Sequence, residues 1–129
     1  MPEFSLTKME RLSGERVIAR LFEEGKGAFA WPFRYLFRAE PAAEAKDGTG
    51  VAMLVSVSKR NFKSAVQRNQ LKRRTREAYR LNKHALIDAA SEKGLHVHLG
   101  LVYSSKDTVA YHDIERAIQK ILAAVIRDL

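Results

Sequence analysis

Apolar residues recur along this chain at two different spacings, which separate predicted helices from predicted strands. Near the N-terminus they repeat at the spacing of one helix face, at Val17, Ile18, Leu21 and Phe22. Ser13 can cap this helix and Gly25 can end it. The segments 33–39, 51–58 and 96–103 instead alternate or run as stretches rich in β-branched residues, which is typical of strands.

Together these patterns predict seven elements in the order αβββαβα. They are a helix at 14–24, strands at 26–31, 33–39 and 51–58, a long helix at about 63–90, a strand at 96–103 and a helix at 111–127. The long helix can break near Asn82 and Lys83 and ends by Gly94. Residues 1–12 are expected to form an extended arm, and 40–50 a polar connection. The order predicts an α+β fold, a sheet backed by helices, in one domain spanning 1–129.

The composition excludes several classes of protein. Hydrophobic residues make up 46% of the chain and charged residues 29%, which is typical of a folded domain. Because there is no cysteine, disulfides, thiolate zinc sites and a cysteine nucleophile are excluded. No apolar run approaches the ~20 residues of a membrane-spanning helix, and residues 1–12 lack the apolar segment of a signal peptide. We therefore expect a cytoplasmic protein.

The positive charge of the chain is concentrated in one segment. The formal net charge is +8, and residues 59–83 contain ten basic residues and a single acid, Glu77. That segment carries +9, which leaves the remainder of the chain at −1. Such a concentration predicts a polyanionic partner, with nucleic acid first and an anionic membrane surface second.

On a helix, most of these basic residues share one face. At about 100° per residue they fall within an arc of roughly 140°, which holds Arg68, Lys72, Arg73, Arg76, Arg80 and Lys83, together with Asn69. A separate arc of Leu71, Thr75 and Ala78 can pack against the sheet. Like charges four residues apart repel by a few tenths of a kcal/mol per pair. Glu77 can pair with Arg73 or Arg74, and we expect phosphates to offset the rest.

Three other interpretations of the basic helix stay open. It can be a solvated face, a helix that lies on a membrane or is bound by calmodulin, or a reader of the DNA major groove. The small apolar face argues against membrane insertion, and no helix-turn-helix spacing precedes the segment. Arginine outnumbers lysine by six to four in 59–83, and its planar guanidinium suits phosphate pairs and stacking on bases.

The segment 55–83, VSVSKRNFKSAVQRNQLKRRTREAYRLNK, resembles the signature of the bacterial ribonuclease P protein family. That signature is a strand ending in V-S-K-K or similar, a short loop, and then R-N-R-x-K-R-x-x-R-E. The positions that match in identity and spacing are Arg68, Asn69, Lys72, Arg73, Arg76 and Glu77. Gln70 stands where the family has arginine, which affects one phosphate contact. Segments 8–12, 17–25 and 33–37 resemble the family's N-terminal start, first helix and following strand, and the strand at 96–103 and the final helix occupy the right places.

This resemblance implies a fold, a function and two binding sites. The fold is expected to be similar to the second domain of ribosomal protein S5, a four-stranded sheet with a left-handed βαβ crossover, against the usual hand. The function implied is that of the accessory subunit of an endoribonuclease that removes the 5′ leader of precursor tRNA. Catalysis then belongs to a large RNA subunit that uses Mg²⁺. The catalytic RNA and precursor tRNA are the expected partners, and no protein partner is evident.

The resemblance also implies which residues form the two sites. Those expected to bind RNA are Lys59, Arg60, Arg68, Asn69, Lys72, Arg73, Arg76 and Arg80. Those expected in a cleft for the leader, between the first helix and the sheet, are Ile18, Phe22, Leu36, Ser56 and Ser58. Core packing is the alternative for the three apolar residues of this cleft. Since Ile18 and Leu36 stand where the family often has aromatics, base stacking, worth ~1–3 kcal/mol per base, rests mainly on Phe22.

The sequence predicts no catalytic or metal site within the chain itself. His96 and His98 lie two apart on one strand face, but no third ligand is evident. Ser56 and Ser58 have no neighbouring base, and carboxylates are scarce near the basic helix. Two other functions stay open: a ribosomal or other structural RNA-binding protein without a processing role, and a metal-dependent nuclease that acts alone.

Overall fold

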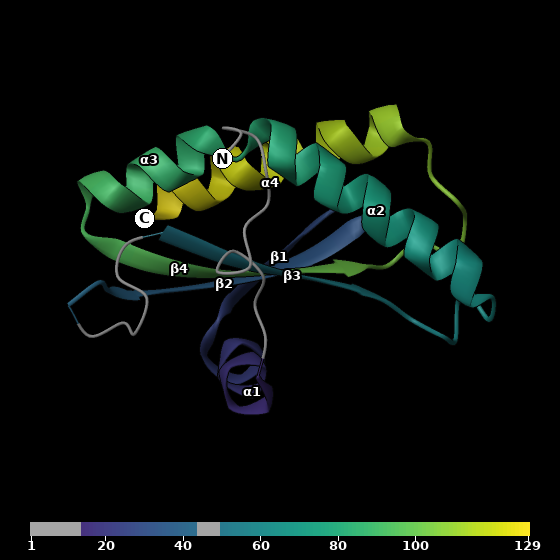
Figure 1. Cartoon of the computed structure of the whole chain (residues 1–129), viewed down its shortest axis with the longest axis horizontal. Coiled ribbons are helices and arrows are strands. Elements are labelled where there is room, and N and C mark those ends of the chain that lie inside the picture. Colours follow the sequence, from purple (N-terminus) through teal and green to yellow (C-terminus); the bar gives the residue numbers. More distant parts are fainter. Residues whose placement is uncertain (1–13, 44–49) are drawn as a thin grey trace.

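The computed structural model describes residues 14–43 and 50–129, which form a sheet with helices on both of its faces (Figure 1). The elements are α1 (Glu15–Glu24), β1 (Lys26–Ala30), β2 (Phe33–Pro41), β3 (Gly50–Val57), α2 (Ala65–Asn82), α3 (His84–Glu92), β4 (Leu95–Tyr103) and α4 (Tyr111–Asp128). The predicted order is confirmed, with the long helix divided at Lys83 into α2 and α3. The expected connection at 40–50 starts later than predicted because β2 continues to Pro41. The expected arm at 1–12 and the cap at Ser13 lie outside the described residues.

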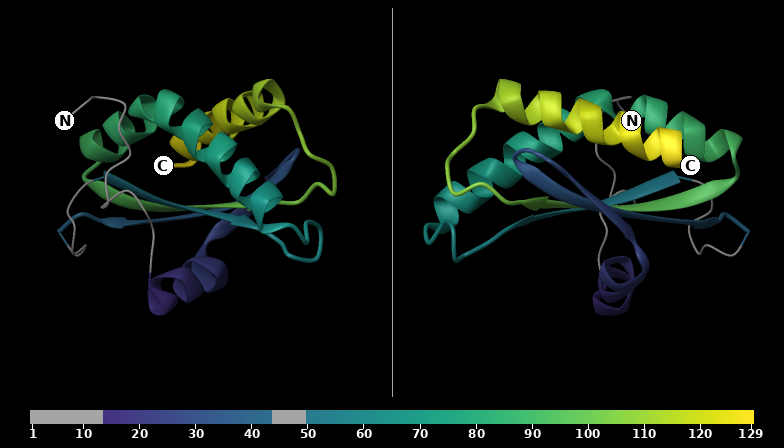
Figure 2. Two further views of the ribbon diagram at one scale, coloured as in Figure 1. Left: turned by 45° about the vertical axis from the view of Figure 1, so that its right-hand side comes forward. Right: turned by 180° about the vertical axis from the view of Figure 1, so that it is seen from behind.

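The four strands form a mixed sheet in the order β1-β2-β4-β3. β2 pairs antiparallel with both β1 and β4, whereas β3 pairs parallel with β4, and α2 and α3 make the crossover between them. In Figure 1 both parallel strands point to the right, β3 lies in front of β4, and the crossover helices lie above them; Figure 2 gives the view from behind. The crossover is therefore left-handed, as the family resemblance implied. The likeness to ribosomal protein S5 stays a prediction.

The main core lies between the sheet and the helices α2, α3 and α4. Alternate residues of β2, β3 and β4 point into it, so each strand contributes one face, as a period of two requires. Tyr103 lies near its edge, with its ring edge-on to Phe33 and Phe62 at centroid distances of 5.7 and 5.8 Å. The Tyr103 hydroxyl accepts a hydrogen bond from the Val109 N–H at 2.9 Å, which fixes the loop that leads into α4.

Helix α1 packs alone on the opposite face of the sheet. Leu21 is completely buried there and packs with Leu36 and Ala52. Gly100 of β4 makes this approach possible, because a Cβ at that position would lie 3.0 Å from Leu21 Cδ2. On this face of the sheet the side chains of Arg34 and Ser56 are exposed. Within the described ranges, none of the helices combines the length and apolar character needed to cross a bilayer.

Candidate nucleic-acid interface

A short basic loop leads from β3 into α2 and is held by its own hydrogen bonds. The Ser58 carbonyl accepts from the Phe62 N–H at 3.1 Å, and Ser58 Oγ accepts from the Arg60 N–H at 3.0 Å. Ser64 then caps α2, where its Oγ accepts from the Gln67 N–H at 3.4 Å. The side chains of Lys59 and Arg60 are exposed. The Ser58 hydroxyl therefore shapes the loop, a role that the sequence did not reveal.

The basic face of α2 carries five of the predicted cations. We call this group the α2 stripe; its members are Arg68, Lys72, Arg73, Arg76 and Arg80. Arg73 is exposed and the other four are half-buried, while Asn69 is exposed within the same arc. Lys83 was predicted to extend the arc, but it is only 2% exposed. That prediction is wrong: the backbone of Lys83 keeps helical angles, but its side chain is buried at the junction of α2 and α3.

By helical angle the α2 stripe lies on a different flank of α2 from Arg74 and Asn82, which hydrogen-bond the loop before α4 and α4 itself. Arg74 lies on the opposite flank of α2, where its guanidinium donates to the Val109 carbonyl at 3.1 Å, in the loop before α4. Leu71 and Ala78 are completely buried beneath the helix. The basic loop leads directly into α2, so the loop and the stripe are adjacent along the chain.

Arg68 has a structural role as well as a place in the stripe. Its Nη1 donates to the Phe62 carbonyl at 2.7 Å and to the Lys63 carbonyl at 3.0 Å, which ties the loop to the first turns of α2. A guanidinium has five N–H donors, and Nε and Nη2 of Arg68 have no partner among the described residues, so they stay available for a phosphate. Substitution of Arg68 would therefore disturb the loop together with any RNA contact.

Glu77 pairs with Arg80, not with Arg73 or Arg74 as expected from the sequence. Arg80 donates from Nη2 to Oε1 at 2.5 Å and from Nε to Oε2 at 3.2 Å. The hydrogen bonds from Arg80 lower the pKa of the Glu77 carboxyl and raise the pKa of Arg80. Lys72 and Arg73 make no ion pair with another described residue. The centre of the stripe therefore keeps its charge.

The predicted leader cleft is divided by the structure into packed and open residues. Leu36 is 4% exposed and lies under Leu21, so it belongs to the packed cluster and not to an open surface. Ile18 is half-buried against the same cluster, whereas Phe22 is 46% exposed. The side chain of Ser56 is exposed on β3. The alternative of core packing thus holds for Leu36, and Phe22 is the open aromatic of α1.

The register of the sheet adds residues that the sequence did not single out. Phe29 pairs with Arg34, Arg34 with Val102, and Val102 with Ser56, so these four form one row across all four strands. Phe29 is 64% exposed and Arg34 is also exposed. By helical angle, Ile18 and Phe22 lie on the flank of α1 that faces this row. Phe29 and Arg34 therefore lie beside Phe22 on the open face of the sheet.

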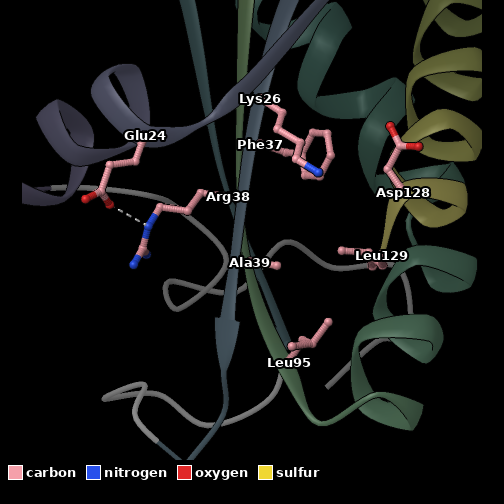
Figure 3. Close-up of a pocket in the computed structure, with 8 residues that line it drawn as sticks. All are labelled: Glu24, Lys26, Phe37, Arg38, Ala39, Leu95, Asp128 and Leu129. Atoms are coloured by element: carbon pink, nitrogen blue, oxygen red, sulfur yellow. Dashed lines mark hydrogen bonds and ion pairs between the residues drawn. The ribbon is translucent and has the colours of Figure 1, made fainter.

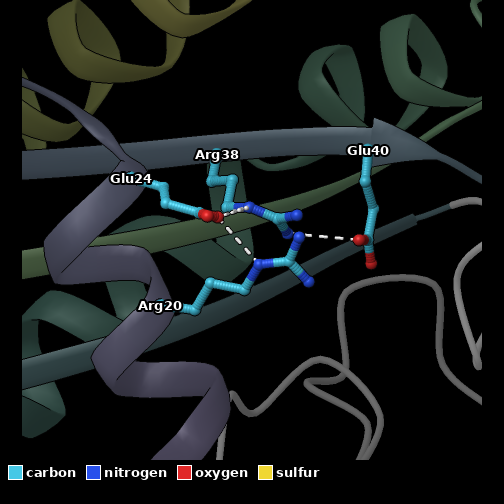
Figure 4. A network of polar contacts seen from close by, with 4 residues as sticks. All are labelled: Arg20, Glu24, Arg38 and Glu40. Carbon is cyan, nitrogen blue, oxygen red and sulfur yellow. Dashed lines mark hydrogen bonds and ion pairs between the residues drawn. The ribbon is translucent and has the colours of Figure 1, made fainter.

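The other flank of α1 is closed by a network of charged residues (Figure 4). Glu24 Oε2 accepts from Arg20 Nε at 2.7 Å and from Arg38 Nε at 3.1 Å, and Arg38 Nη1 donates to Glu40 at 3.2 Å. The hydrogen bond from Arg20 is the main reason why the pKa of the Glu24 carboxyl is lowered. Because Arg38 belongs to β2, the network fixes α1 across the sheet and leaves the Phe22 flank open.

The described residues contain no evident catalytic or metal centre. A pocket of about 230 Å³ includes Glu24 and Arg38 on one side of β2 and Lys26, Phe37 and Asp128 on the other (Figure 3). Its charges are of both signs, and Glu24 and Arg38 already pair with each other. The His96 and His98 rings lie 4.9 Å apart, but residues 14–43 and 50–129 offer no group of three or more metal-ligating side chains.

Fold and surface together define a basic α+β protein that presents a cationic helix and an open sheet face to a polyanion. The model of the ribonuclease P family matches residues 6–126. The ribonuclease P protein component of Porphyromonas gingivalis W83 is 38% identical over 124 residues, which cover 96% of this chain and 88% of that protein. The chain belongs to the ribonuclease P protein family, which confirms the predicted resemblance.

Solved structures share the fold. The ribonuclease P protein of Staphylococcus aureus matches with a TM-score of 0.68 at 19% identity, covering 92% of this chain and 96% of that chain. The protein from Thermotoga maritima matches with a TM-score of 0.65 at 24% identity, covering 89% and 96%. The comparisons thus agree with the predicted α+β class and element order.

Proposed function

We propose that this chain is the protein subunit of ribonuclease P and that it binds the catalytic RNA through the α2 stripe. The observation that carries this proposal is the charge at the centre of the stripe, where Lys72 and Arg73 make no ion pair with another described residue. Phosphates can supply the missing counter-charge. Exposed Lys59 and Arg60 extend the same surface, and the Asn69 amide can both donate and accept a hydrogen bond.

The 5′ leader of precursor tRNA is assigned to the open sheet face beside α1. Bases of a single strand can be splayed out and stacked on aromatic side chains, and Phe22 and Phe29 are both exposed there. Arg34, between Phe29 and Val102 in the cross-strand row, is available for the backbone phosphates. Ser56 lies at the far end of that row. This site is on the opposite face of the sheet from α2.

In this proposal the chemistry belongs to the RNA subunit. The carboxylate nearest the α2 stripe, Glu77, is engaged by Arg80, and the described residues offer no cluster that would hold Mg²⁺. We therefore assign Mg²⁺ to the RNA and give the protein two tasks. It screens phosphate repulsion between catalytic RNA and precursor, and it holds the leader in position. A cytoplasmic location stays a prediction.

Reconstitution tests this proposal directly. Ribonuclease P RNA is incubated at low magnesium with and without the protein, using precursor tRNA with a leader as the substrate. We expect the protein to restore cleavage at the mature 5′ end, and its affinity for leader-bearing tRNA to exceed that for leaderless tRNA. Failure to restore cleavage would favour a structural RNA-binding protein. Cleavage by the protein without RNA, lost on addition of EDTA, would favour a metal-dependent nuclease.

A further inference from the structure

Trp31 is an exposed aromatic residue at the turn between β1 and β2, two residues after Phe29 of the proposed leader surface. Its side chain is 56% exposed. It lines a pocket of about 170 Å³ together with Asp113, Arg116, Ala117 and Lys120 of α4. These α4 residues place the pocket on the helix-covered side of the sheet, whereas Phe22 and Phe29 belong to the α1 side. No residue of α2 lines the pocket, so we treat the Trp31 pocket as a third surface.

The helix wall of this pocket is cationic. Arg116 and Lys120 are one turn apart, and Arg127 falls within about 40° of them on the same side of α4. All three side chains are exposed. Neither Arg116 nor Lys120 forms an ion pair or hydrogen bond with another described residue. Their charge is therefore available to a ligand.

The helix wall of the pocket keeps a net positive charge after the acidic residues of α4 are counted. Asp113 lines the pocket, so Arg116 and Lys120 outnumber it by one charge. Glu115 lies on the opposite flank, where its Oε2 accepts from Asn82 Nδ2 at 3.1 Å and from the Tyr111 hydroxyl at 3.4 Å. An indole ring beside two cations joins a stacking surface to a phosphate-binding surface.

We infer that Trp31, Arg116 and Lys120 form a second single-strand RNA site, which takes one unpaired nucleotide. The base stacks on the Trp31 indole, and the flanking phosphates contact Arg116 and Lys120. Stacking and a basic wall together distinguish this site from a face that merely attracts anions. The inference rests on the proposed function only in that RNA is the partner. An unpaired nucleotide of the catalytic RNA or of the precursor could occupy the pocket while the α2 stripe and the leader surface are engaged.

Trp31 is the only tryptophan of the chain, so tryptophan fluorescence reports on the surroundings of this side chain. The isolated protein is titrated with a short oligoadenylate, and with tripolyphosphate as an anion that has no base. We expect saturable quenching of Trp31 by the oligoadenylate and none by tripolyphosphate. The double substitution Arg116→Gln and Lys120→Gln should raise the half-saturating concentration about 25-fold near 0.1 M salt, for two lost phosphate contacts on a single strand.

A matched variant makes the experiment specific. Lys26→Gln with Lys93→Gln removes the same charge from exposed positions at the other end of the sheet, outside the proposed RNA surfaces, and should leave the half-saturating concentration of Trp31 quenching within about twofold. Three results would overturn the inference: no quenching at saturation, equal loss in both double variants, or equal quenching by tripolyphosphate. Since neither ribonuclease P RNA nor precursor is present, the outcome is independent of the reconstitution assay.

Discussion

Replacing Lys72 and Arg73 by glutamine should weaken binding of the catalytic RNA without destabilising the protein. Lys72 has cationic neighbours at i−4 and i+4, Arg68 and Arg76. Its substitution therefore removes two repulsions, each worth a few tenths of a kcal/mol. Glutamine has nearly the helix propensity of lysine and arginine, so the free energy of unfolding should stay equal or rise slightly. Function and stability thus respond in opposite directions.

The loss of affinity follows from the number of phosphate contacts. Each neutralised phosphate contributes about 0.7 to 0.9 to the slope of log K against log salt. Two lost contacts should therefore make this slope shallower by about 1.4 to 1.8. If the variant and the unsubstituted protein bind equally at 1 M salt, this difference in slope makes the variant bind roughly 25- to 60-fold more weakly at 0.1 M salt. That loss of affinity is about 2 kcal/mol.

Filter binding to ribonuclease P RNA over a salt series measures the slope, and urea unfolding measures the stability. Lys93→Gln with Lys106→Gln is the matched control, because both lysines are exposed, lie outside α2, and carry the same total charge. The control should retain the slope of the unsubstituted protein. If both double variants lost slope equally, the overall charge of the protein would explain binding, and the geometry of the α2 stripe would not matter.

Three further predictions test the opposite face of the sheet. Phe22→Ala should weaken binding of leader-bearing precursor roughly 5- to 150-fold, which is the worth of one stacked base. Binding of leaderless tRNA, measured in the same titration, should not change. Equal loss for both tRNAs would refute the assignment. Gly100→Ala should lower the free energy of unfolding, measured in urea, by about 1–3 kcal/mol through overpacking. The reason is that the Cβ of the new alanine would lie 3.0 Å from Leu21 Cδ2. Unchanged stability would show that α1 can shift to make room. Burial, aided by the charge of His96, lowers the pKa of His98 below the ordinary value of 6.5. As the pH falls, His98 is protonated in the unfolded chain before it is protonated in the folded protein, so the stability of the fold decreases as the pH drops below 6.5. The melting temperature of His98→Gln should therefore fall less steeply over this pH range. An identical pH profile for the two proteins would contradict this explanation.

Local patterns in the sequence were enough to predict the elements and the basic face of α2. Both depend on periodicity within a single segment, since residues four apart on a helix share a face whatever lies around it. The same logic failed at Lys83, whose side chain is buried at the junction of α2 and α3. It also failed for Glu77. Arg73, Arg74 and Arg80 all lie within reach of its carboxylate on the helix, and the side-chain rotamers determine that Arg80 is the partner.

The sequence by itself thus determined the order of the elements, the family and the charge of α2. Each of these depends on residues that are close together in the sequence. The tertiary structure decided which residues meet across the sheet and between layers. The row from Phe29 to Ser56 exists only once strand order and register are fixed. Leu36 became core because α1 packs over it, and Trp31 met Arg116 because α4 lies beside the β1–β2 turn. Contacts between residues so far apart in sequence arise from the packing of whole elements, which no local pattern encodes.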